Sequence, residues 1–131
     1  MNDDYIFSTT DPLNREVRLK KTTWEFHVMN EHEERKHFKG NEDFFENLVS
    51  DPDYIFSQES IGPNVRWKYS SYGNIKEEGN PKIYNIIAED NSNHMDIVTI
   101  LETSKTQLKE SERKKEAKIY DRRKKNKDWR G

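Results

Sequence analysis

The chain has 131 residues, a formal net charge of −2 and no cysteine. One domain is the default at this length, and the lack of cysteine excludes disulfide scaffolds, zinc ribbons and thiol nucleophiles. Apolar residues make up 31% of the chain, against roughly 45–50% in ordinary globular proteins, so the core is small. No apolar stretch approaches the ~18–20 residues of a membrane span, and no signal segment opens the chain. We therefore expect a cytoplasmic protein with no membrane partner.

The near-zero net charge hides two oppositely charged parts. Residues 104–131 contain 12 Lys or Arg and 5 Asp or Glu, a net charge of +7, whereas residues 1–103 have a net charge of −9. Only 5 of the 28 residues from 104 onward are apolar. This composition predicts a folded domain over residues 1–103 and a basic tail over residues 104–131.

The first half of the chain reads as one short strand and two helices. Residues 17–20 alternate apolar and basic side chains, as in a half-buried strand. A helix is expected from Thr22 or Thr23, because Glu25 stands at capping-box spacing from Thr22. A second helix should begin at Asn41 and end at the Asp-Pro-Asp sequence of residues 51–53.

The pattern then changes to strands. Residues 54–57 are short and apolar, and residues 65–72 alternate, with Val65, Trp67 and Tyr69 on one face. Residues 82–89 and 95–101 flank the polar residues 90–94, which predicts a hairpin with a five-residue loop. Helices followed by an antiparallel meander indicate an α+β domain.

The tail contains helix-forming residues from Ser104 to about Lys125, and Gln107 has capping-box spacing from Ser104. Its few apolar residues form no continuous stripe, so little packing would hold it against the body. We therefore predict a projecting, basic helical extension.

Two histidines, His27 and His32, lie in the region of the first helix. A five-residue spacing turns them ~140° apart on a regular helix, so they can face one site only if the helix ends before His32. Alternatively, one is a partly buried histidine beside Trp24, and the other is exposed in a charged loop.

Two sets of cations could bind phosphate. Arg66 and Lys68 share the face of the predicted strand opposite Val65, Trp67 and Tyr69; such a face can bind phosphate, but it can equally be the solvated side of the sheet. The tail contains a basic run between Tyr120 and Trp129, a pattern typical of nucleic-acid contacts or of a soluble helix end. Its basic residues are Arg122, Arg123, Lys124, Lys125 and Lys127.

No Gly-rich phosphate loop, His-Glu-x-x-His sequence or serine-nucleophile motif occurs in the chain. The Asp-Asn-Ser-Asn sequence of residues 90–93 lacks the acidic spacing and terminal Glu of a calcium loop. We therefore predict neither a metal site nor a cofactor.

Several segments together resemble a known family. Residues 24–28 (Trp-Glu-Phe-His-Val), followed by His32, are similar to the Trp-x-x-His…His-Pro-Glu segment of the PBECR-type domains of phages and mobile elements. These are nuclease-like relatives of barnase, EndoU, tRNase colicins and RelE toxins. Residues 48–56 resemble the family's helix–Asp-Pro-Asp–strand passage, and residues 84–89 with 97–100 resemble its closing hairpin, including Thr99. Glu33 stands where the family usually has Pro, and the basic tail has no counterpart.

The resemblance implies two N-terminal helices packed on a roughly four-stranded antiparallel sheet, with a cleft for RNA on that sheet. It implies a metal-independent ribonuclease in which the 2′-hydroxyl attacks the neighbouring phosphate. His27 or His32 would transfer protons, since an unperturbed His pKa of ~6.5 suits this role, and Thr99 would contact the phosphate. From the face of the strand and the chemistry we add Arg66 and Lys68 as phosphate-binding groups and Tyr69 or Tyr72 as a positioning group or proton donor.

The expected partners follow from this hypothesis. They are an RNA, either tRNA or mRNA, and an antitoxin or immunity protein if the domain is a toxin or phage effector. The alternative is a non-catalytic RNA- or protein-binding module of the same fold, such as a phage accessory protein, because fold alone does not determine function.

Overall fold

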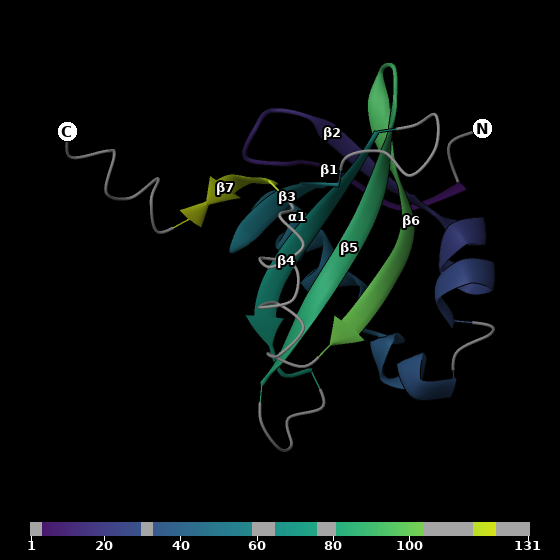
Figure 1. Cartoon of the computed structure of the whole chain (residues 1–131). Coiled ribbons are helices and arrows are strands. Elements are labelled where there is room, and N and C mark those ends of the chain that lie inside the picture. The colour runs from purple at the N-terminus through teal and green to yellow at the C-terminus, as the bar shows by residue number, and fades with distance from the viewer. Residues whose placement is uncertain (1–3, 30–32, 59–64, 76–80, 104–116, 123–131) are drawn as a thin grey trace.

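A computed structural model of the chain describes residues 4–29, 33–58, 65–75, 81–103 and 117–122. These residues form one seven-stranded sheet in the order β1-β2-β6-β5-β4-β3-β7 (Figure 1). Neighbouring strands are antiparallel, except that β2 and β6 run parallel. The strands are β1 (Tyr5–Thr10), β2 (Glu16–Lys20), β3 (Tyr54–Gln58), β4 (Arg66–Gly73), β5 (Lys82–Asn91), β6 (His94–Thr103) and β7 (Ala117–Asp121).

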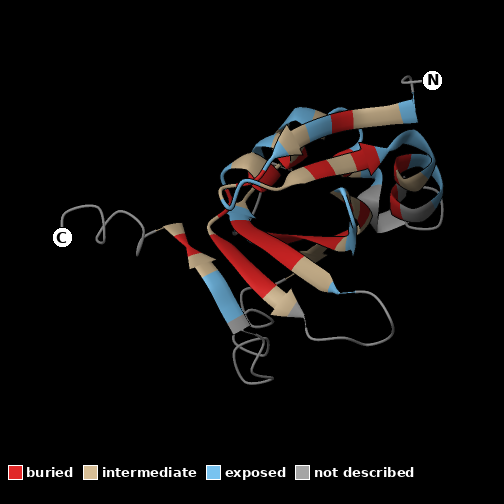
Figure 2. Ribbon diagram, turned by 90° about the horizontal axis from the view of Figure 1, so that it is seen from above, coloured by how far each residue is buried: buried red, intermediate tan, exposed pale blue. Residues whose placement is uncertain are grey.

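Three helical segments lie between β2 and β3: η2 (Thr23–Met29), η3 (Glu33–Phe38) and α1 (Glu42–Ser50). Helix α1 contacts both β1, at one edge of the sheet, and β4, four strands further along it. The sheet therefore curves around α1, and its concave face and this helix enclose the core (Figure 2). Within the described residues, no helix has the length and apolar character needed to cross a membrane.

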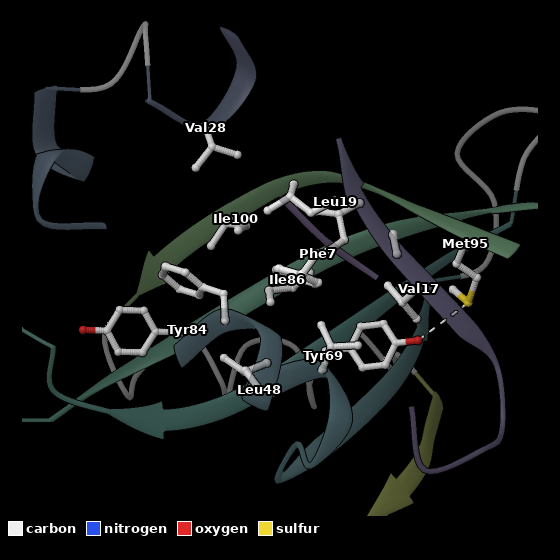
Figure 3. Close-up of a cluster of buried hydrophobic side chains, with 14 of the residues drawn as sticks. Phe7, Val17, Leu19, Val28, Leu48, Tyr69, Tyr84, Ile86, Met95 and Ile100 are labelled. Carbon is white, nitrogen blue, oxygen red and sulfur yellow. Dashed lines mark hydrogen bonds between the residues drawn. The ribbon is translucent and has the colours of Figure 1, made fainter. Parts of the chain in front are cut away.

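The core forms where α1 meets the concave face of the sheet (Figure 3). Successive side chains of a strand point to opposite faces, so each strand contributes alternate residues. Tyr84, Ile86 and Ala88 of β5 are buried in this cluster, and α1 contributes Leu48 and Val49. We refer to this side of the sheet as the core face, and to the other as the outer face.

A buried carboxylate ties the β1–β2 turn to β4. The Asp11 side chain is fully buried and accepts hydrogen bonds from the backbone N–H groups of Leu13 and Arg15, each at 2.9 Å. It also accepts bonds from Arg15 Nε at 2.9 Å and from the Tyr69 hydroxyl at 2.6 Å. Four donors therefore replace the water that this carboxylate loses on folding.

The expected architecture of two N-terminal helices on a four-stranded antiparallel sheet, with a helical C-terminal extension, is wrong. The sheet has seven strands and mixed direction, and the described chain begins with the β1–β2 hairpin rather than with helices. The predicted strand at residues 17–20 is present as part of β2. No strand was predicted at its partner β1, because apolar and polar residues do not alternate cleanly along that segment. Its hydrophobic residues pack against α1, which only the folded chain brings near.

Residues 117–121 form strand β7 rather than part of a helix. This strand pairs with β3, whose outer edge would otherwise leave its backbone N–H and C=O groups unpaired. Tyr120 also packs against the core. Pairing and packing thus override the helix propensity of the segment, and these residues belong to the same sheet as the acidic body.

Other expected elements are confirmed. Helix α1 begins at Glu42 and ends before the Asp-Pro-Asp sequence, and β3 and β4 occupy the predicted positions. The β5–β6 hairpin is tighter than predicted, because only Ser92 and Asn93 separate the two strands. Ser92 adopts a φ of 57°, which a tight hairpin turn requires.

Replacing Gly73 with Ala should destabilise the fold by about 1–3 kcal/mol through overpacking. A Cβ at this position would lie 2.7 Å from Cζ of Phe44, whose ring packs edge-on against Tyr84 at a centroid distance of 5.2 Å. Urea unfolding measures the change. In a Phe44→Ala background, Gly73→Ala should lower the free energy of unfolding by less than in the wild type. An equal loss in both backgrounds would show that the contact with Phe44 is not the cause.

The hydroxyls of Tyr69 and Tyr84 should lose their protons at a higher pH than those of ordinary tyrosines. Burial raises the pKa of both hydroxyls, and hydrogen bonds to Asp11 and Glu102, respectively, raise them further. Because the folded-state pKa is higher than that of the unfolded chain, the resulting stability is complete below pH 10 and declines as the pH rises further. Spectrophotometric titration of the tyrosines checks this. Tyr69→Phe and Tyr84→Phe should each remove one tyrosine that ionises only at unusually high pH. If either variant instead lost a tyrosine that ionises in the ordinary range, the prediction would be wrong.

Candidate active site

Four charged residues form a row across the outer face of the sheet. The strand register places Arg18 of β2 beside Asp96 of β6, Asp96 beside Glu89 of β5, and Glu89 beside Arg66 of β4. At about 4.8 Å between neighbouring strands, the row spans about 14 Å between its end Cα atoms. We call these four residues the charged row.

Alternation along the strands explains why the charged row faces outward. The sequence neighbours Val17, Met95 and Ala88 are buried in the core, so residues one position away point to the opposite side of the sheet. The charged side chains remain partly exposed: 29% for Arg18, 17% for Asp96, 24% for Glu89 and 43% for Arg66. A solute could therefore reach them.

Each arginine of the charged row is held by a glutamate. Arg66 Nε donates to Glu89 Oε2 at 2.8 Å, and its Nη2 lies 2.7 Å from the same oxygen. Arg18 donates from Nε and Nη2 to the two carboxylate oxygens of Glu16, at 3.1 and 3.2 Å. These contacts restrict the two flexible side chains, which lowers the entropy lost when a further anion binds.

A histidine–aspartate pair adjoins the middle of the charged row. His94 Nε2 lies 3.1 Å from Asp96 Oδ1, and Asn91 donates to the other Asp96 oxygen at 3.0 Å. His94 and Asp96 are two residues apart on β6 and so share the outer face. An imidazole oriented by a carboxylate is a common arrangement for general acid–base catalysis.

The local charges are nearly balanced. The Arg18 hydrogen bond, and then the Ser8 hydroxyl, lower the pKa of Glu16, while the bonds to Glu16 and Tyr5 raise the pKa of Arg18. Along this part of the outer face, the two arginines thus lie among three carboxylates, those of Glu16, Glu89 and Asp96. The group is neutral when His94 carries a proton and has one negative charge when it does not.

Three of the predicted site residues lie together on the outer face. Arg66 belongs to the charged row, and the next row of the sheet pairs Lys68 with Ile87 and Ile87 with Thr99. Lys68 is only 7% exposed, and its Nζ lies 5.0 Å from the centre of the Phe56 ring. Lys68 is therefore buried, which neither a solvated face nor a freely accessible phosphate site would predict.

Tyr69 and Arg122 lie away from this group. Tyr69 is fully buried on the core face and bonded to Asp11, so the sheet separates it from Arg66. Arg122 follows β7 and pairs with Asp51 and Asp53 at 3.2 and 3.1 Å.

Tyr72 lies near the far end of β4 and is 43% exposed, and the side chains of the other predicted residues lie outside the description. The backbone of His27 belongs to η2, which contacts β2 and β6, but its side chain is outside the description. His32, Arg123, Lys124, Lys125 and Lys127 lie outside the described residues.

The sequence predictions missed His94, Asp96, Arg18 and Glu89. The His-x-Asp spacing at the start of a predicted strand was a usable signal, because it puts both side chains on one face. Arg18 and Glu89 gave no such signal, since their proximity depends on the order of the strands. The parallel β2–β6 pair in particular joins segments that are far apart in the sequence.

A second histidine–carboxylate pair lies on the core face. His37 Nε2 of η3 is 2.8 Å from Glu102 Oε2 of β6, and Glu102 also bonds to the buried Tyr84 hydroxyl. Asn41, the expected helix cap, instead donates its side-chain amide to the backbone carbonyl of His37. This pair thus fastens η3 to the sheet. Over the described residues, no three His, Asp or Glu side chains are grouped so that they could hold a metal ion.

The Glu16 carboxyl should titrate below its ordinary value of 4.5, which NMR titration of the side chain measures. Arg18→Gln should move the midpoint back toward 4.5, whereas Lys20→Gln, two residues along the same strand, should not. The pair stabilises the fold above the ordinary pKa, and this contribution is lost as the pH falls through the lowered one. An unchanged midpoint in Arg18→Gln would show that the pair does not persist in solution.

The chain was compared with models of known protein families, with curated proteins and with solved structures. None of the three comparisons gives a match. The likeness to PBECR-type domains therefore rests on the sequence motifs described above, and the activity that it implies is a proposal.

Proposed function

We propose that this protein is a metal-independent ribonuclease whose active site is the outer face of the sheet around His94. The observation that carries this proposal is the position of the His94–Asp96 pair beside a row that ends in Arg18 and Arg66. A proton-transfer group and two cations thus share one face. Cleavage of RNA by its own 2′-hydroxyl needs these groups.

The reaction is a transfer of the phosphoryl group within the RNA. His94 accepts the proton of the 2′-hydroxyl as that oxygen bonds to phosphorus, and the bond to the 5′-oxygen breaks. A second acid protonates the departing oxygen, a role that the resemblance gives to His27 or His32. The products are a 2′,3′-cyclic phosphate and a 5′-hydroxyl. Asp96 orients the imidazole and stabilises its protonated form.

The two arginines would stabilise the additional negative charge on phosphorus in the transition state. Each retains N–H groups beyond those bonded to its glutamate, because a guanidinium has five. Thr99 lies in the adjacent row and would hydrogen-bond the phosphate. The net charge of +7 over residues 104–131 would supply affinity for RNA of any sequence.

The alternative is a binding module of the same fold without catalysis. Two observations favour it: both arginines are already paired with carboxylates, and Asp96 adds a third carboxylate, which is paired with His94. Such a surface would repel phosphate unless the ion pairs rearrange. It would suit a protein partner that bears both positive and negative groups. The two hypotheses therefore predict different ligands, RNA for the enzyme and a protein for the binding module.

The deciding experiment is cleavage of total tRNA in EDTA and, separately, of ribosome-bound mRNA in the Mg²⁺ buffer that keeps ribosomes assembled. His94→Ala should lower the cleavage rate by about 10²–10⁴-fold, the usual contribution of an acid–base group. Asp96→Asn should also lower it, by up to about 10⁴-fold, because it leaves the histidine in place without its charged partner. Cyclic-phosphate ends on the products would confirm attack by the 2′-hydroxyl.

The matched control is His37→Ala, which removes a histidine that is also paired with a carboxylate but lies on the core face. It should leave the rate nearly unchanged, as long as circular dichroism shows a folded protein. Variants of His27 and His32 test the second acid. Full activity in His94→Ala would exclude this site, and no cleavage of either RNA by the wild type would leave the binding module.

A further inference from the structure

An open pocket lies at the end of β4 that is remote from the charged row. Its cavity volume is about 320 Å³, and it is formed by α1, the turn before β3, the end of β4 and the residue that follows β7. The lining residues are Phe44, Asn47, Leu48, Asp51, Asp53, Ser71, Tyr72 and Arg122. Arg66 and Tyr72 are six positions apart on β4, about 20 Å along the strand, so the pocket is distinct from the proposed active site.

One carboxylate of the pocket is fixed by the backbone of β4. Asp53 Oδ2 accepts the N–H of Tyr72 at 3.0 Å, and the N–H of Asp53 donates to the Ser71 hydroxyl at 2.9 Å. The side chain of Asp53 is 25% exposed, whereas that of Asp51 is 71% exposed. The pocket thus offers one preorganised and one accessible carboxylate.

These carboxylates already bind a guanidinium from the same chain. Arg122 Nη1 lies 3.1 Å from Asp53 Oδ1, and Nε lies 3.2 Å from Asp51 Oδ1. Nη2 donates to the backbone carbonyl of Asp51. Because two aspartates face one arginine, the charged groups among the described lining residues carry one net negative charge after this pairing.

Beside the carboxylates the pocket has an apolar wall. Phe44 and Leu48 of α1 line it, and Tyr72, 43% exposed, contributes an aromatic ring at the solvent side. Aromatic faces attract cations through the ring quadrupole. Net negative charge, an exposed aromatic side chain and apolar lining residues together suit a cation with an aliphatic stem.

We propose that this pocket binds an organic monocation, a guanidinium or primary ammonium group on an aliphatic stem. The cation pairs with Asp51 at the open side, next to the site that Arg122 occupies, and the stem lies along Phe44 and Tyr72. The cation can belong to a free small molecule or to an Arg or Lys side chain of a partner protein. The proposal does not depend on the ribonuclease activity.

The test is isothermal titration of the full chain at low ionic strength with arginine amide and, separately, with a short peptide that contains one Arg. Asp51→Asn should weaken binding about three- to tenfold, as expected for loss of one charge-assisted contact. The control Asp43→Asn removes an exposed carboxylate of α1 outside the pocket and should change nothing. Similar affinities for both probes identify a free cation as the ligand, and at least tenfold tighter peptide binding identifies a protein partner.

A second variant tests the sign of the charge. Arg122→Gln removes the positive charge of the pocket and should strengthen binding of arginine amide, provided that amide exchange shows β7 still paired with β3. If instead inorganic phosphate binds the wild type and Arg122→Gln abolishes that binding, the pocket is an anion site and the proposal is wrong. Absence of binding by both cationic probes also overturns it.

Discussion

The packing of α1 against the concave face of the sheet is the interaction on which the other features depend. It fixes which side chains of each strand point inward, since a shift of one residue in register would bury the polar set and expose the apolar one. Once Tyr84, Ile86 and Ala88 of β5 are committed to the core, Glu89 must point outward. The charged row is therefore a consequence of how the core is packed.

A β-bulge extends this consequence to the candidate site. The register of β5 with β6 shifts between Ile87 and Ala88, so that these residues face Thr99 and Ile97 with one residue of β6 inserted between them. This insertion lets both Ile97 and Ile100 reach the core, although strict alternation would put them on opposite faces. It also brings Asp96 and Thr99 to the same outer face.

The charged row and the pocket hold their arginines in the same way, by ion pairs with carboxylates. At the charged row, Arg18 and Arg66 are held by Glu16 and Glu89; at the pocket, Arg122 is held by two aspartates. When Asp96 is counted with Glu16 and Glu89, the carboxylates outnumber the arginines in both places, in keeping with the net charge of −9 over residues 1–103. Binding of an anion at the charged row must therefore overcome nearby negative charge, whereas binding of a cation at the pocket is assisted by it.

The sequence by itself determined the local elements whose signals lie within a few residues. Asn41 and the Asp-Pro-Asp sequence bounded α1, and the polar residues 90–94 between two strand segments identified the β5–β6 hairpin. Alternation identified β4 and put Arg66 and Lys68 on one face. These features depend on backbone preferences and on the two-residue period of a strand, which are local. Tertiary structure decided the rest: β1 and β7 as strands, the parallel β2–β6 pair, and the bulge. Each of these depends on partners distant in the chain. The same holds for the two sites: His94 and Asp96 lie near Arg18 and Arg66, and Arg122 pairs with Asp51 and Asp53, only in the folded chain.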